Sequence, residues 1–149
     1  MRVVIQRVKY ATCTIDGKIT GRCDKGFMLL IGFKDGDGDI ELNKMLQKVT
    51  GMRIFEDENG KMNKSLKDVD GTILAISQFT LYADCKHGNR PGFTDAMAFD
   101  KASLYYDKFV SMLRNAGYHT EVGIFGADMK IELLNDGPVT ILLDTDDLL

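Results

Sequence analysis

Helical periodicity is confined to two stretches of this chain, and that restricts the possible folds more than any other feature of the sequence. Apolar residues recur at helical spacing in residues 39–52 and again in residues 94–117. The other apolar residues form short runs typical of strands, grouped around the two helices rather than alternating with them one by one. The pattern indicates an α+β fold in which a mainly antiparallel or mixed sheet, forming a partial barrel, packs with two principal helices.

The first helix is expected to begin with Asp39 as its cap and to end near Gly51. The second is expected to begin at a Thr94 or Asp95 cap and to stop at Gly117, because glycine is the residue that most often ends a helix. Their predicted one-sided faces are formed by Leu42, Met45, Leu46, Val49 and Met52 in the first helix and by Phe99, Ala102, Tyr106, Phe109, Leu113 and Ala116 in the second.

The strands are predicted from alternating or continuous apolar runs bounded by turn residues. An Asp16-Gly17 hairpin turn of two residues makes Ile15 face Lys18 and Cys13 face Thr20, and a further turn is expected at Asn59-Gly60. The expected strands are 2–9, the two arms of the hairpin within 11–23, 26–33, 72–77, 129–134 and 139–143.

Composition favours one soluble globular domain spanning residues 1–149. A chain of 149 residues is long enough to bury a core without metal or disulfide support. Its 44% hydrophobic and 28% charged residues exclude disordered, collagen-like and membrane classes. The apolar run at the N-terminus is broken at Gln6 and Arg7, too early for a signal peptide or a membrane span, and the three cysteines include no C-x-x-C pair. These features predict a cytoplasmic protein with free thiols and no membrane partner.

Charge and metal-binding patterns exclude several functions. The net charge of −3 disfavours a protein that coats DNA or RNA, although basic residues dominate 1–34, which fits either a local RNA contact or a solvated strand face. Asp35-Gly36-Asp37-Gly38-Asp39 resembles the start of a calcium loop, but Ile40 and Leu46 occupy the positions that need Gly and Glu. We interpret it as a solvated turn that leads into a helix cap. No metal site and no cofactor is expected.

Three polar segments stand out from the strand and helix pattern. Ser77-Gln78-Phe79-Thr80 follows a buried strand, and Gly88-Asn89-Arg90-Pro91-Gly92-Phe93 is a polar loop that leads into the second helix. The third segment, Asn135-Asp136-Gly137-Pro138-Val139-Thr140, lies between two predicted strands. Its spacing alone predicts a tight turn, since Asn, Asp, Gly and Pro are the main turn residues.

In these segments the sequence resembles the D-aminoacyl-tRNA deacylases of the bacterial and eukaryotic type, which include D-tyrosyl-tRNA deacylase. The resemblance extends over the whole chain. It implies a cofactor-free cytosolic homodimer, with active sites at the subunit interface, that hydrolyses the ester at the 3′ end of a D-aminoacyl-tRNA and rejects L-aminoacyl substrates. The matching segments are Met1 to Val8, Ser77 to Leu81, Asn89 to Pro91, Phe125 to Met129 and Asn135 to Thr140.

The resemblance also assigns roles to individual residues. Gly137-Pro138 is expected to be a cis peptide that reaches the partner's active site as a chirality filter, supported by Arg7. Met129 fits either the substrate pocket or the core, and His87 and Arg90 fit either tRNA contacts or a solvated loop. The catalytic segment implied by the resemblance is Ser77, Gln78, Phe79 and Thr80.

The chemistry of that segment leaves two mechanisms open. Thr80 is a possible nucleophile, but neither histidine lies in a motif that would activate it. Water assisted by the 2′-hydroxyl of the terminal ribose is the alternative that we favour. Because a filter that acts on the side chain ignores glycine, glycyl-tRNA is predicted to be cleaved as well. Rival functions are a non-catalytic RNA-end binder, which would stack bases on Phe79, Tyr82 and Phe93, and a small-molecule esterase or amidase.

Overall fold

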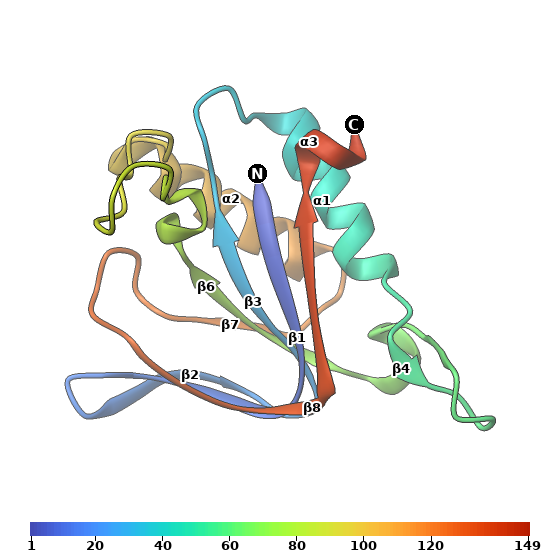
Figure 1. Ribbon diagram of the computed structural model, residues 1–149. Helices are drawn as coiled ribbons and strands as arrows, with labels where there is room; N and C mark the ends of the chain where they lie inside the picture. The colour runs from blue at the N-terminus through green and yellow to red at the C-terminus, as the bar shows by residue number, and fades with distance from the viewer.

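The computed structural model describes residues 1–149 as a strongly curled mixed sheet with the two long helices packed against it (Figure 1). The helices are α1 (Asp39–Gly51), α2 (Phe99–Asn115) and the short α3 (Thr145–Leu148), with single turns η1 (Lys67–Val69) and η2 (Phe79–Tyr82). A small hairpin is formed by β4 (Phe55–Glu56) and β5 (Met62–Lys64). The six strands of the main sheet are β1 (Arg2–Ile15), β2 (Lys18–Cys23), β3 (Gly26–Gly32), β6 (Thr72–Ser77), β7 (Thr120–Val122) and β8 (Lys130–Asp144).

The long strand β1 organises the sheet. Antiparallel β8 lies along one edge of β1, and β3 followed by β2 lies along the other, while β6 and β7 continue the sheet in parallel. The outer strands β2 and β7 approach so closely that a Cβ on Gly21 would lie 2.3 Å from the Val122 carbonyl oxygen. The Arg22 N–H also donates to the Glu121 carboxylate at 3.0 Å. The result is a nearly closed barrel with two main helices, which confirms the predicted α+β fold.

The helical faces predicted from periodicity form the core between the helices and the sheet. Leu42, Met45 and Val49 of α1 are buried in one cluster with Phe109 and Leu113 of α2. Phe99 and Ala116, at the two ends of the predicted α2 face, are exposed instead. A second apolar cluster, which includes Cys13 and Cys23, lies on the other side of the sheet. No helix in the fold is long and apolar enough to cross a lipid bilayer.

The helix ends differ from expectation at their N-termini. Gly38, not Asp39, caps α1, and its N–H donates to the Glu41 carboxylate at 2.8 Å. The Thr94 or Asp95 cap predicted for α2 is wrong, because the helix begins at Phe99. The intervening backbone instead pairs with the residues just after β3: Ala96 forms a bridge with Lys34, and the Met97 N–H donates to the Phe33 carbonyl at 3.0 Å. Gly117 ends α2 with φ +97°, as predicted.

The predicted interruption near residue 10 is absent, since β1 runs unbroken from Arg2 to Ile15. The hairpin turn at Asp16-Gly17 does pair Ile15 with Lys18. A bulge between Cys13 and Thr14 then shifts the register by one residue, so Cys13 faces Gly21 rather than Thr20. All three cysteines are free, and burial raises the pKa of the Cys23 thiol to about 11.

Candidate active site

A cavity of about 650 Å³ opens where β3 and β6 end. Its wall is formed by the ends of these strands, the start of η2, the segment that leads into α2, the first turn of α2, and residues 125–129 and 131. Three of the four residues implied as catalytic, Ser77, Gln78 and Phe79, line this cavity, and Met129 lines it from the opposite segment. Thr80 follows them in the turn but is not part of the wall.

The turn η2 sits tightly against the end of β3. The Gln78 N–H donates to the Ile31 carbonyl at 2.7 Å, and a Cβ on Gly32 would lie 2.8 Å from the Gln78 carbonyl oxygen. The first hydrogen bond within the turn runs from the Leu81 N–H to the Gln78 carbonyl. The N–H groups of Phe79 and Thr80 come before this first bond in the chain, so they have no acceptor within the turn.

The cavity wall is poor in ionisable groups. It contains no His, Cys, Lys, Arg or Glu, and its one ionisable side chain, Asp128, is exposed at the rim beside Lys130. The Thr80 hydroxyl accepts a hydrogen bond from the Gln78 amide, which is a donor and cannot take the hydroxyl proton. No group of three or more His, Cys, Asp and Glu is placed to hold a metal ion. The groups that this site offers for catalysis are therefore mainly backbone dipoles.

Aromatic pairs flank the cavity. Phe79 meets Phe93 edge to face with ring centroids 5.0 Å apart, and Phe99 meets Phe125 in the same way at 4.9 Å. Such rings offer stacking surfaces for a planar ligand. His87 and Arg90 lie in the exposed loop that leads to this region, and neither lines the cavity.

The Asn135–Thr140 segment is not the tight turn that its sequence predicts. It is part of β8, which continues along β1 on both sides of the segment. Gln6 pairs with Thr140 and Val8 with Asn135, so the single β1 residue Arg7 faces the four residues 136–139 of β8. The segment therefore forms a wide bulge, and within it the Gly137-Pro138 peptide bond is cis.

Side chains brace this bulge from both ends. Arg7 is 5% exposed, and its guanidinium donates to the carbonyls of Asp136 at 2.8 Å and Ile54 at 2.6 Å. The Asn135 side chain accepts the Val139 N–H at 2.7 Å and donates to the Val139 carbonyl at 3.1 Å. A Cβ on Gly137 would lie 3.0 Å from an Arg7 nitrogen, at φ +141°. The role of Asn135 was missed in the sequence, where Asn appeared only as a turn residue.

The residues of the expected site are thus in two separate places in this chain. Ser77, Gln78, Phe79 and Met129 meet at the cavity, whereas Gly137, Pro138 and Arg7 do not line it. Gly137 and Pro138 are exposed even though their bulge is braced.

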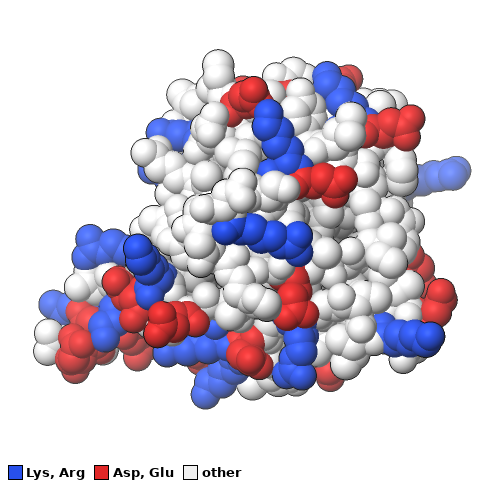
Figure 2. Space-filling model, turned by 180° about the vertical axis from the view of Figure 1, so that it is seen from behind, with Lys and Arg blue, Asp and Glu red and all other residues white.

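Charge does not distinguish a nucleic-acid surface on the face shown in Figure 2. Basic and acidic side chains are interspersed there, and they crowd together over the protruding β4–β5 hairpin at the lower left. That hairpin carries an ion pair between Lys64 and Glu58 at 2.9 Å. The basic excess of the N-terminal third therefore does not appear as a continuous basic surface in this view.

Comparison with known proteins places this architecture in one family. The profile of D-Tyr-tRNA(Tyr) deacylase matches residues 4–144. The D-aminoacyl-tRNA deacylase of Limosilactobacillus reuteri (strain DSM 20016) is 52% identical over 144 residues, which cover 97% of this chain and 99% of that protein. That of Lactobacillus acidophilus is 55% identical with the same coverage.

Two solved structures share the fold of this chain. A c-Myc DNA unwinding element binding protein superposes with a TM-score of 0.91 at 39% identity, covering 97% of this chain and 98% of that one. A probable eukaryotic D-amino acid tRNA deacylase shares the fold at 21% identity, with a TM-score of 0.83 and coverage of 95% and 97%. The chain therefore belongs to the D-aminoacyl-tRNA deacylases, hydrolases that remove D-amino acids from tRNA.

Proposed function

We propose that this deacylase is a cytoplasmic chiral proofreading enzyme that works as a homodimer, with each cavity completed by the Gly137-Pro138 bulge of the partner subunit. One observation carries the proposal: the bulge is braced by Arg7 and Asn135 yet exposed outside its own subunit's cavity. Braced, exposed backbone suits a rigid contact with something beyond the subunit. Leu134 and Leu142, 47% and 62% exposed on β8, give the same strand apolar surface for a second copy.

The filter works through main-chain atoms of the bulge. Backbone carbonyl oxygens there receive the α-ammonium of the substrate, since ammonium groups donate and carbonyls accept. With the ammonium and the ester both held, the remaining choice at the α-carbon is the direction of the side chain. An L side chain is driven against the backbone wall, whereas a D side chain points outward. Glycine has nothing to reject and passes.

The chemistry takes place at η2. The free N–H groups of Phe79 and Thr80 stabilise the oxyanion that forms when the ester carbonyl is attacked, which is worth about 2.7–4 kcal/mol per donor in other acyl-transfer enzymes. Ser77 and Gln78 hold the terminal adenosine, and Met129 forms part of the wall. His87 and Arg90 contact the tRNA near its 3′ end from their exposed loop. The attacking group is water assisted by the ribose 2′-hydroxyl, because the bond from Gln78 supplies no base to Thr80.

Stereochemical preference is the direct test of this function. D-tyrosyl-tRNA and glycyl-tRNA are expected to be cleaved, and L-tyrosyl-tRNA to survive at the same enzyme concentration, because only an L side chain meets the wall. The measurement is the rate of release of free tRNA from each substrate, with D-tyrosine ethyl ester as the control for a small-molecule esterase. Equal cleavage of the ethyl ester, tight tRNA binding without hydrolysis, or a fully resistant glycyl-tRNA would each contradict the proposal.

The nucleophile is tested at Thr80. The Thr80→Ala variant is expected to keep turnover within about threefold of the wild type, since it retains the backbone N–H and loses only a hydroxyl without a base. A D-aminoacyl-tRNA ending in 2′-deoxyadenosine is expected to be cleaved far more slowly. Single-turnover rates measure both. A variant that binds substrate normally but no longer turns it over would instead make Thr80 the nucleophile.

A further inference from the structure

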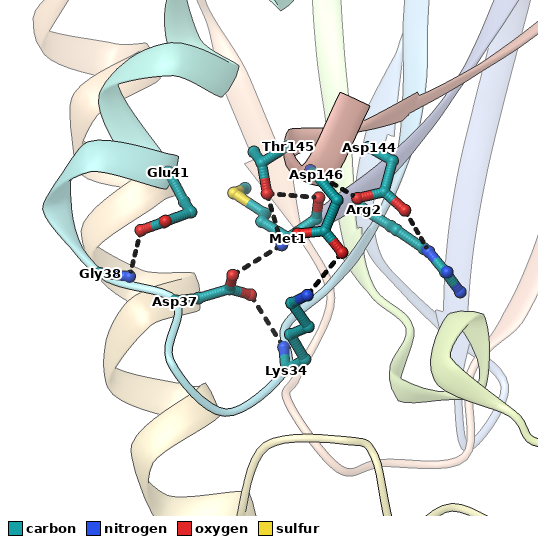
Figure 3. Close-up of polar contacts among 9 residues, drawn as sticks. All are labelled: Met1, Arg2, Lys34, Asp37, Gly38, Glu41, Asp144, Thr145 and Asp146. Atoms are coloured by element: carbon teal, nitrogen blue, oxygen red, sulfur yellow. Dashed lines mark hydrogen bonds and ion pairs between the residues drawn. The ribbon is translucent and has the colours of Figure 1, made fainter. Parts of the chain in front are cut away.

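A cluster of polar contacts at the start of β1 reaches the turn η2 through Arg2. The Met1 ammonium is buried and contacts the Asp37 carboxylate at 2.8 Å and the Thr145 hydroxyl at 2.9 Å (Figure 3). Next to it, the Arg2 Nε donates to the Asp144 carboxylate at 2.7 Å, and the other Asp144 oxygen accepts the Asp146 N–H at 3.0 Å. This network joins β1, the loop before α1, and the end of β8.

Arg2 extends the network to the far end of η2. Its Nη1 donates to the Leu81 carbonyl at 2.8 Å, and its guanidinium carbon lies 4.5 Å from the centre of the Tyr82 ring. A carbonyl in the last turn of a helix lacks an intrahelical partner, so Arg2 satisfies a group that the turn itself leaves open. The start of η2 is held separately, by the Gln78 N–H on Ile31 and by close contact with Gly32.

The geometry at Arg2 requires a guanidinium rather than any cation. One planar group donates in two directions, to Asp144 and to Leu81, while its face covers Tyr82. The hydrogen bond to Asp144 raises the pKa of Arg2. Burial opposes ionisation of Asp144, but the bonds from Arg2 and the Asp146 N–H outweigh it and lower the pKa of Asp144. The pair is therefore charged at neutral pH, and its carboxylate fixes the direction of the guanidinium.

The Tyr82 side chain at that end of the turn depends on Arg2 for its cover. Its hydroxyl is buried and has no hydrogen-bond partner, so packing and the cover from Arg2 are what hold the ring. The Ala83 N–H bonds back to the Thr80 carbonyl at 3.1 Å, within the turn itself. Without Arg2, η2 keeps its bond at Gln78 and the packing of Leu81 against Gly32. It loses the one side-chain hydrogen bond that its own carbonyls accept.

We propose that Arg2 is a positioning residue for catalysis, which holds the C-terminal end of η2 so that the N–H groups of Phe79 and Thr80 stay aimed into the cavity. The inference rests on the proposed role of those two N–H groups. It assigns Arg2 no contact with substrate. It makes deacylation depend on a side chain that lies outside the cavity wall and to which the sequence alone assigned no role of its own.

The test compares Arg2→Lys with Arg22→Lys. Lysine keeps the charge at position 2 but donates from one point, so it cannot reproduce both bonds of the guanidinium. Arg22 is the matched control, because it is an exposed strand arginine paired with Asp24 at 3.4 Å and has no contact with η2. We expect Arg2→Lys to lower kcat for D-tyrosyl-tRNA about tenfold or more with KM within about twofold, since small displacements of catalytic groups reduce rates strongly. Arg22→Lys is expected to match the wild type.

Hydrogen exchange provides the readout that is independent of activity. In Arg2→Lys the N–H groups of Leu81 and Ala83 are expected to exchange faster, while those of β6 and α2 stay as protected as in the wild type. Asp144→Asn, which keeps Arg2 but removes its carboxylate partner, is expected to move both kcat and exchange in the same direction by less.

The two measurements separate the possible failures. Faster exchange with unchanged kcat would overturn the proposal by showing that Arg2 holds the turn but that catalysis does not need this contact. Unchanged exchange and kcat would overturn it while the wild-type activity and its D preference stand. Exchange that rises throughout the chain, with kcat and KM both impaired, would make Arg2 merely structural and would also overturn it.

Discussion

Replacement of Asp37 by Asn is expected to lower the free energy of unfolding by about 3–5 kcal/mol, the cost of breaking a buried ion pair by removing one partner. The Met1 ammonium and the Asp37 side chain are 0% and 3% exposed. Loss of the carboxylate leaves the buried ammonium without a counter-charge, with only neutral oxygens, the new amide and the Thr145 hydroxyl, to accept from it. It also weakens the loop before α1, since the second Asp37 oxygen accepts the Lys34 N–H at 2.8 Å.

Urea denaturation at neutral pH measures this change, and Asp39→Asn is its matched control. Asp39 lies two residues away and is also ion-paired, with Lys108 at 2.5 Å. In this pair the Asp39 side chain is 67% exposed and the Lys108 side chain 51%. An exposed pair contributes about 0–1 kcal/mol. Equal destabilisation by the two substitutions would show that the burial of Asp37 adds nothing. The comparison therefore isolates the effect of burial from that of charge.

Asp37 also illustrates what the sequence could not reveal. The Asp35–Asp39 segment was interpreted as a solvated turn, which is correct for Asp35 and Asp39 but wrong for Asp37. Alternating Asp and Gly carry only local information, and nothing in that pattern indicates that one carboxylate meets the chain's own N-terminus. Helix periodicity, by contrast, depends on the helix itself, and the core faces of α1 and α2 were therefore largely predictable.

The candidate site shows the same contrast between features that a local sequence pattern reveals and contacts that only the fold creates. Ser77, Gln78, Phe79 and Met129 were predicted from the resemblance, and they line one cavity. Asn135 and Arg2 were not assigned a role, because their partners are backbone groups: Val139 within the bulge, and Leu81 far along the chain. The bulge itself was mistaken for a turn because turn residues mark a bend, whereas only the pairing with β1 on both sides shows that the strand continues.

The Arg7→Ala variant is expected to lose discrimination between D- and L-tyrosyl-tRNA by at least about tenfold, a change of about 1.4 kcal/mol in relative transition-state binding. Arg7 is buried and holds the Asp136 carbonyl, so in the proposed filter its removal frees the Gly137-Pro138 backbone to yield to an L side chain. Ratios of kcat/KM for the two substrates measure the effect, and circular dichroism verifies folding. Arg7→Lys, which keeps the buried charge, serves as the milder variant. An unchanged ratio in a folded variant would remove Arg7 from the filter.

Mixing of subunits decides whether the proposed filter acts across the proposed dimer interface. Phe79→Pro supplies a partner with an intact filter and an impaired cavity, since proline removes one of the free N–H groups at a turn position that tolerates it. The loss expected is about 10²- to 10³-fold, whereas Phe79→Ala keeps the N–H and should lose less. An excess of Phe79→Pro subunits then pairs each Arg7→Ala cavity with a native bulge.

In those mixed dimers, donation across the interface predicts that cleavage of L-tyrosyl-tRNA by the Arg7→Ala cavities falls while cleavage of the D isomer continues. A filter that served its own subunit would leave the L rate unchanged at any excess of the partner. A fall in the cleavage of the L isomer alone cannot arise from dilution or from a general loss of activity, since both of these would lower the cleavage rates of the two isomers together. The outcome therefore depends only on which subunit supplies the exposed bulge of residues 136–139 to a given cavity.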